Sequence, residues 1–149
     1  MIERDTSNRY AVFFISPHIY GYEKILEVKW QMDEDEGRGF SQPDISPRFS
    51  LFEAEAKMLA QEANYAKLER LLRDFLHNPR TNRELYVQIL EWEFLPRHGN
   101  QVLKHWQDQE LIDVADLHDD RPARKGSFYL NWRSYRQDTP RVKFTLKRS

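Results

Sequence analysis

The sequence of 149 residues contains no cysteine, which excludes disulfide bonds and thiolate metal sites. No apolar run approaches the roughly 20 residues that a membrane-spanning helix needs. The start lacks the charged, apolar and small-residue order of a signal peptide. Glycine is scarce, with five residues, while 32% of the chain is charged and 40% is hydrophobic. We therefore expect a helix-rich cytoplasmic protein with a packed core and no membrane partner.

The sequence also lacks the motifs that are typical of catalytic and metal sites. The five histidines, none of them in a His-x3-His pattern, are His18, His77, His98, His105 and His118. On one helix, His98 and His105 would stand about 10 Å apart along the axis, too far to share a metal. There is no glycine-rich phosphate loop and no Gly-x-Ser-x-Gly elbow. The sequence predicts no catalysis by this chain alone, and no cofactor or metal.

The first half of the chain predicts a strand and two helices. An apolar stretch over 10–16 is typical of a strand covered on both faces. An apolar stripe at helical spacing predicts a helix over 20–32. The four consecutive acids of 33–36 lack the alternating spacing of a calcium loop and indicate a solvated connection. Residues 53–77 contain no glycine or proline and predict one long helix, or two with a break at Asn64.

The stretch over 80–114 gives the strongest local signals. Thr81 followed by Glu84 has the spacing of a capping box and predicts the start of a helix over 82–92. Pro96 suits the first turn of a second helix over 97–109. Their expected inward side chains are Leu85, Ile89, Val102, Leu103 and Trp106. A strand over 111–114 follows.

The remainder predicts a hairpin. The polar residues 116–126 separate the strand over 111–114 from a strand over 127–132, and alternation predicts another strand over 141–146. With residues 116–126 as the wing, this gives the order helix, turn, helix, strand and wing, which is that of a winged helix-turn-helix. We therefore expect an α+β fold, with an N-terminal strand–helix extension and acidic loop over 1–53 and a winged-helix domain over 54–149, forming one compact unit.

Charge is unevenly distributed along a chain whose net charge is −1. Residues 1–75 carry 10 basic and 14 acidic side chains, whereas residues 76–149 carry 13 basic and 10 acidic ones. A basic end of this kind can supply phosphate contacts, although a solvated hairpin with a charged tail would look the same. Asp108 and Glu110 would confine DNA contact to the first half of the second helix. The candidate nucleic-acid-binding residues on that helix and on the wing are Arg97, Asn100, Gln101, Lys104, His105, Arg121, Arg124 and Lys125.

Two regions resemble a known family. Residues 10–18 together with 21–30 are similar to the strand and following helix of three-Cys-motif partner proteins. Residues 94–98, with 102–104 and 111–112, look like the C-terminal winged-helix region of those proteins, and like the winged-helix domain named after gamma-mobile-trio elements. The resemblance implies a winged-helix module linked to mobile elements or defence. It implies no methyltransferase activity, because the methyltransferase-like Rossmann domain of the longer members has no counterpart in this sequence.

The sequence thus predicts a non-catalytic winged-helix module that binds duplex DNA. The alternative is an adaptor subunit that docks on a protein, such as a nuclease, a methyltransferase or a recombinase. In that case the acidic run 33–36 or the strand over 10–16 would be the docking surface. Homodimerisation through the long helix is a third possibility.

Overall fold

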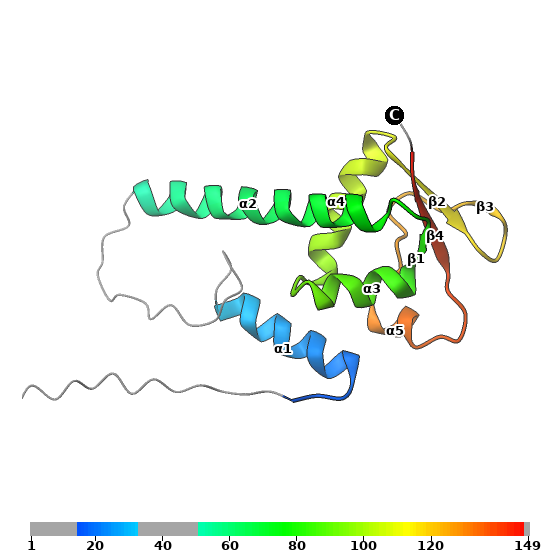
Figure 1. Cartoon of the computed structure of the whole chain (residues 1–149), viewed down its shortest axis with the longest axis horizontal. Helices are drawn as coiled ribbons and strands as arrows, with labels where there is room; N and C mark the ends of the chain where they lie inside the picture. The colour runs from blue at the N-terminus through cyan, green and yellow to red at the C-terminus, as the bar shows by residue number, and fades with distance from the viewer. Residues whose placement is uncertain (1–14, 33–50, 148–149) are drawn as a thin grey trace, which may run out of the picture.

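A computed structural model describes residues 15–32 and 51–147. Over these residues the fold is α+β, with five helices and a four-stranded antiparallel sheet in the order β1-β4-β2-β3. Helices lie on one side of the sheet, and the long helix α2 extends away from it (Figure 1). The acidic run 33–36 lies outside the described residues. So does most of the expected strand over 10–16, of which Ile15 and Ser16 are described and are not in a strand.

The first two helices occur where the sequence predicts them. α1 (Ile19–Met32) packs against α3, where the Tyr86 hydroxyl donates to Glu23. Trp30 Nε1 of α1 donates a 2.8 Å hydrogen bond to the carbonyl of Glu93, two residues after the end of α3. α2 (Leu51–Phe75) is a single helix of 25 residues that continues through Asn64. Of the two alternatives left open by the sequence, one long helix is therefore correct.

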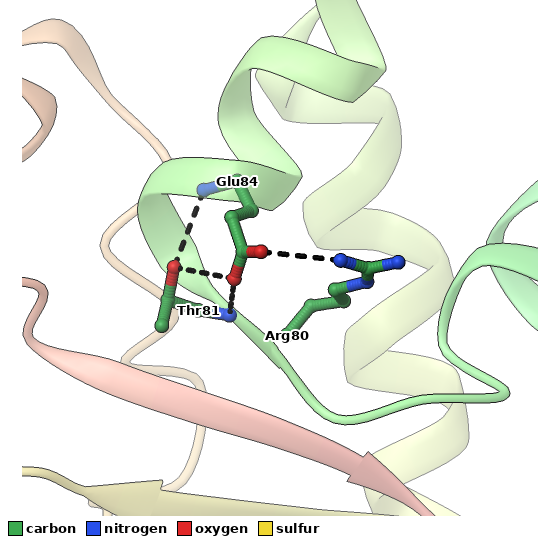
Figure 2. A network of polar contacts seen from close by, with 3 residues as sticks. All are labelled: Arg80, Thr81 and Glu84. Carbon is green, nitrogen blue, oxygen red and sulfur yellow. Dashed lines mark hydrogen bonds and ion pairs between the residues drawn. The ribbon is translucent and has the colours of Figure 1, made fainter.

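The third helix, α3 (Asn82–Glu91), begins with the predicted capping box (Figure 2). The Glu84 amide donates to Thr81 Oγ1 at 3.3 Å, and the Thr81 amide donates to Glu84 Oε2 at 2.8 Å. These bonds, with Arg80 alongside, lower the pKa of the Glu84 carboxyl. Arg80 and Thr81 also form a short strand, β1 (Arg80–Thr81), which pairs with β4 and which the sequence did not predict.

The fourth helix, α4 (Pro96–Asp108), has Pro96 in its first turn, as predicted. The expected inward residues Val102, Leu103 and Trp106 are all fully buried. Gly99 allows a close approach to α3, because a Cβ built there would lie 2.4 Å from Cδ1 of Ile89. The two helices therefore pack with almost no space at this crossing.

The sheet packs against α3 and α4. β2 (Ile112–Asp116) and β4 (Val142–Leu146) pair antiparallel, with Val114 opposite Phe144. Val142 and Phe144 are fully buried, which confirms the alternation read from the sequence for the last strand. The short β3 (Arg121–Pro122) pairs with β2 at the edge of the sheet.

The expected strand over 127–132 is wrong. Phe128 and Leu130 are buried in the core, but Tyr129 has a positive φ of 53° and its carbonyl accepts from Asn82 Nδ2 at 3.2 Å. This left-handed residue interrupts the extended backbone that strand pairing needs. The chain then forms the short helix α5 (Trp132–Tyr135), whose N-cap is Asn131.

Candidate nucleic-acid interface

The outer face of α4 carries three of the predicted contact residues. Arg97, Gln101 and Lys104 are all exposed, and their spacing of four and three residues places them on one side of the helix. Asp108 follows four residues later on the same side. The first three turns of this face therefore carry two cations and an amide, and a carboxylate appears at the last turn.

Asn100 and His105 occupy the two edges of this face. Asn100 is half-buried. His105 is exposed and its ring centroid lies 6.5 Å from that of Tyr65 on α2. Both residues flank Arg97, Gln101 and Lys104 rather than extend their row.

The first turn of α4 is held by a neutral histidine. His98 Nδ1 accepts the Leu95 amide proton at 3.0 Å, and its Nε2 lies 3.4 Å from Nε of Arg97. Burial, followed by the charge of Arg97, lowers the pKa of His98 to about 4. The imidazole is therefore neutral at pH 7, with Nδ1 as the acceptor for the Leu95 amide and the single ring proton on Nε2.

The predicted wing is attached to the C-terminal end of α4. Gly126, with a φ of 78°, donates its amide proton to Gln107 Oε1 at 2.9 Å. Lys125 Nζ lies 2.5 Å from Asp108 Oδ1, and this contact lowers the pKa of the Asp108 carboxyl. The structure thus brings Lys125 to the helix but neutralises its charge there. Arg121 and Arg124 are exposed on the wing.

The rest of the basic end is dispersed rather than gathered beside α4. Arg141 stacks over Tyr129 at 5.3 Å, and Lys147 pairs with Asp113 at 3.2 Å. The wing itself also carries acids, including Asp119 and Asp120. The charge surplus seen in the sequence is therefore no guide to the location of a binding surface.

Three residues of α2 that the sequence did not mark as contact residues lie beside the candidate face. Gln61, Asn64 and Tyr65 share a cavity with Arg97 and Gln101. No local signal marks them, because polar and aromatic residues on a helix are ordinary in a sequence. Their position depends on how α2 crosses α4, which is a tertiary feature.

Comparisons with protein-family models, with curated proteins and with solved structures find no match. Within residues 15–32 and 51–147, no helix has the length and apolar character needed to cross a membrane. Over the same ranges, no group of three or more His, Cys, Asp or Glu side chains is placed to hold a metal ion.

Proposed function

We propose that the chain is a non-catalytic winged-helix module that binds duplex DNA through α4. The order α2, β1, α3, α4, β2, wing, β4 supports this fold, since β4 lies between β1 and β2 as the last strand of a winged helix does. The resemblance to winged-helix regions of three-Cys-motif partner and gamma-mobile-trio proteins stays a prediction from the sequence. A role in a mobile-element or defence system, and a cytoplasmic location, stay predictions.

The observation that carries this proposal is the outer face of α4. Arg97, Gln101 and Lys104 are exposed on the second helix of the helix-turn-helix pair, the helix that enters the major groove in such proteins. Arginine can hold a phosphate or read a base edge, glutamine can read a base edge, and lysine can hold a phosphate. Arg97 and Lys104 stand about 10 Å apart along the axis, so one groove can receive both.

The wing would contribute a second set of contacts. Arg121 and Arg124 are exposed near the C-terminal end of α4 and are suited to bind the backbone of the same duplex. Lys125 would join them only after release from Asp108.

Removal of both cations from α4 tests the proposal. The double variant Arg97→Ala/Lys104→Ala should bind a duplex roughly tenfold or more weakly, since one good base contact alone is worth about 1–3 kcal/mol. The matched control is Arg133→Ala/Arg136→Ala, which removes the same charge from exposed positions at α5. Fluorescence anisotropy with a labelled duplex gives both affinities. Equal losses in the two variants would show that α4 has no specific part in binding.

A protein partner is the second candidate, and the N-terminal half of α2 favours it. Met58 and Leu59 are 63% and 60% exposed on a segment that extends beyond the core. Such side chains often mark a protein interface. The adaptor function would be favoured if the protein retained a nuclease, methyltransferase or recombinase encoded beside this chain but retained no duplex at moderate salt. Met58→Glu/Leu59→Glu should then lose the protein partner.

A further inference from the structure

A cavity of about 340 Å³ opens between the end of α1, the middle of α2 and the start of α4. Its aromatic lining comes from Trp30, Tyr65 and Phe94, and its polar lining includes Gln61, Arg97 and Gln101. The volume lies at the lower end of the range for small-molecule sites, about 300–1,000 Å³. It suits one ligand of mononucleotide size.

The aromatic wall of the cavity is fixed in place. The Trp30 ring lies 4.5 Å from that of His98 and 5.7 Å from that of Phe94. The indole proton of Trp30 is already donated to the Glu93 carbonyl at 2.8 Å. Trp30 and Phe94 are only 5% and 4% exposed and form the closed floor of the cavity, so the half-buried Tyr65 is the ring available for stacking.

The rim of the cavity is polar, in contrast to its aromatic wall. Gln61 from α2 and Gln101 from α4 are both exposed, and each amide can donate and accept hydrogen bonds. Arg97 adds a positive charge at the same rim. Among the described residues that line the cavity there is no Asp or Glu, so an anionic ligand meets no like charge in its wall.

We propose that this cavity binds a nucleotide, with the base stacked on Tyr65, its edge read by Gln61 and Gln101, and its phosphate at Arg97. The inference deepens the proposed DNA binding, on which it rests, because Arg97 and Gln101 belong also to the outer face of α4. The same chemistry has two sources: an unpaired base of a DNA strand, or a free nucleotide.

The test measures binding of the four deoxynucleoside monophosphates to the full chain by calorimetry, with inorganic phosphate as the reference. Binding should exceed that of phosphate. Tyr65→Ala should weaken it by roughly tenfold to a hundredfold, the range expected for loss of one stacking partner. Gln61→Ala, at an exposed position, provides a second variant that leaves the core untouched, and Met58→Ala on the same helix is the control.

Measurements of duplex binding distinguish an unpaired base of a strand from a free nucleotide as the ligand. They also test the nucleotide site separately from DNA binding through α4. If a strand supplies the base, a duplex with a single-stranded overhang should bind more tightly than a blunt one. Tyr65→Ala should abolish this difference, and Met58→Ala should preserve it. If free nucleotide is the ligand, the overhang has no effect and the monophosphates still bind. Three results would overturn the nucleotide site, even if blunt duplex binds through α4. The first is equal binding of phosphate and nucleotides, and the second is unchanged nucleotide binding in both Tyr65→Ala and Gln61→Ala. The third is that the protein binds no nucleotide and binds overhang and blunt duplexes equally.

Discussion

Asn82 joins three parts of the fold, and its replacement by alanine has a predictable cost. The side chain is fully buried. Its Oδ1 accepts the amide protons of Arg141 at 2.8 Å and Val142 at 3.2 Å, and its Nδ2 donates to the Tyr129 carbonyl at 3.2 Å. Alanine would leave three backbone groups without their partner. A buried unpaired group costs about 1–3 kcal/mol, and water can reach the half-buried Arg141, so we expect a loss of about 3 kcal/mol.

This loss should appear as a fall in the melting temperature of roughly 10 °C, since 1 kcal/mol corresponds to about 2–4 °C for domains of this length and more for shorter ones. Urea unfolding followed by circular dichroism gives the free energy directly. Asn78→Ala is the control, because Asn78 is exposed and should change stability by less than about 0.5 kcal/mol. A loss below about 1 kcal/mol in Asn82→Ala would refute the view that these bonds hold the last strand to α3.

Three further predictions concern residues of α4. Since His98 stays neutral down to a pKa of about 4 while an unfolded histidine protonates near 6.5, stability should fall as pH is lowered from 6.5 to 4. After allowance for solvent screening this fall is roughly 1–2 kcal/mol, and His98→Gln, which keeps an acceptor for the cap, should abolish it in thermal melts. Gly99→Ala should destabilise by about 1–2 kcal/mol in urea titrations, because the added methyl displaces Ile89; an unchanged midpoint would contradict this. Asp108→Asn should tighten duplex binding in anisotropy titrations by freeing Lys125, whereas unchanged affinity would place the wing outside the interface.

The features that could be predicted from sequence are those fixed within a few residues. The Thr81–Glu84 capping box and Pro96 determine where α3 and α4 begin, through local hydrogen bonding and a fixed φ. Helical spacing identified the buried face of Val102, Leu103 and Trp106. Each signal depends on neighbours along the chain, so no tertiary information was needed.

The features that were missed depend on distant partners. Residues 127–130 alternate like a strand, yet the Tyr129 carbonyl is bound by Asn82, 47 positions earlier. β1 has two residues and exists because β4 lies beside it. In the candidate site, Lys125 looked like a free cation in the sequence, but the fold places it against Asp108. The cavity beside α4 likewise needs α1 and α2 to meet there.

The salt dependence of duplex binding tests the central proposal most directly. If Arg97, Lys104, Arg121 and Arg124 each contact one phosphate, the logarithm of the association constant should fall with the logarithm of salt concentration at a slope of about −3.6. Arg97→Ala/Lys104→Ala should reduce that slope by about 1.8, while Arg133→Ala/Arg136→Ala should leave it unchanged. A native protein that binds no duplex at low salt, or equal slopes in the native protein and the α4 variant, would contradict DNA binding through this helix.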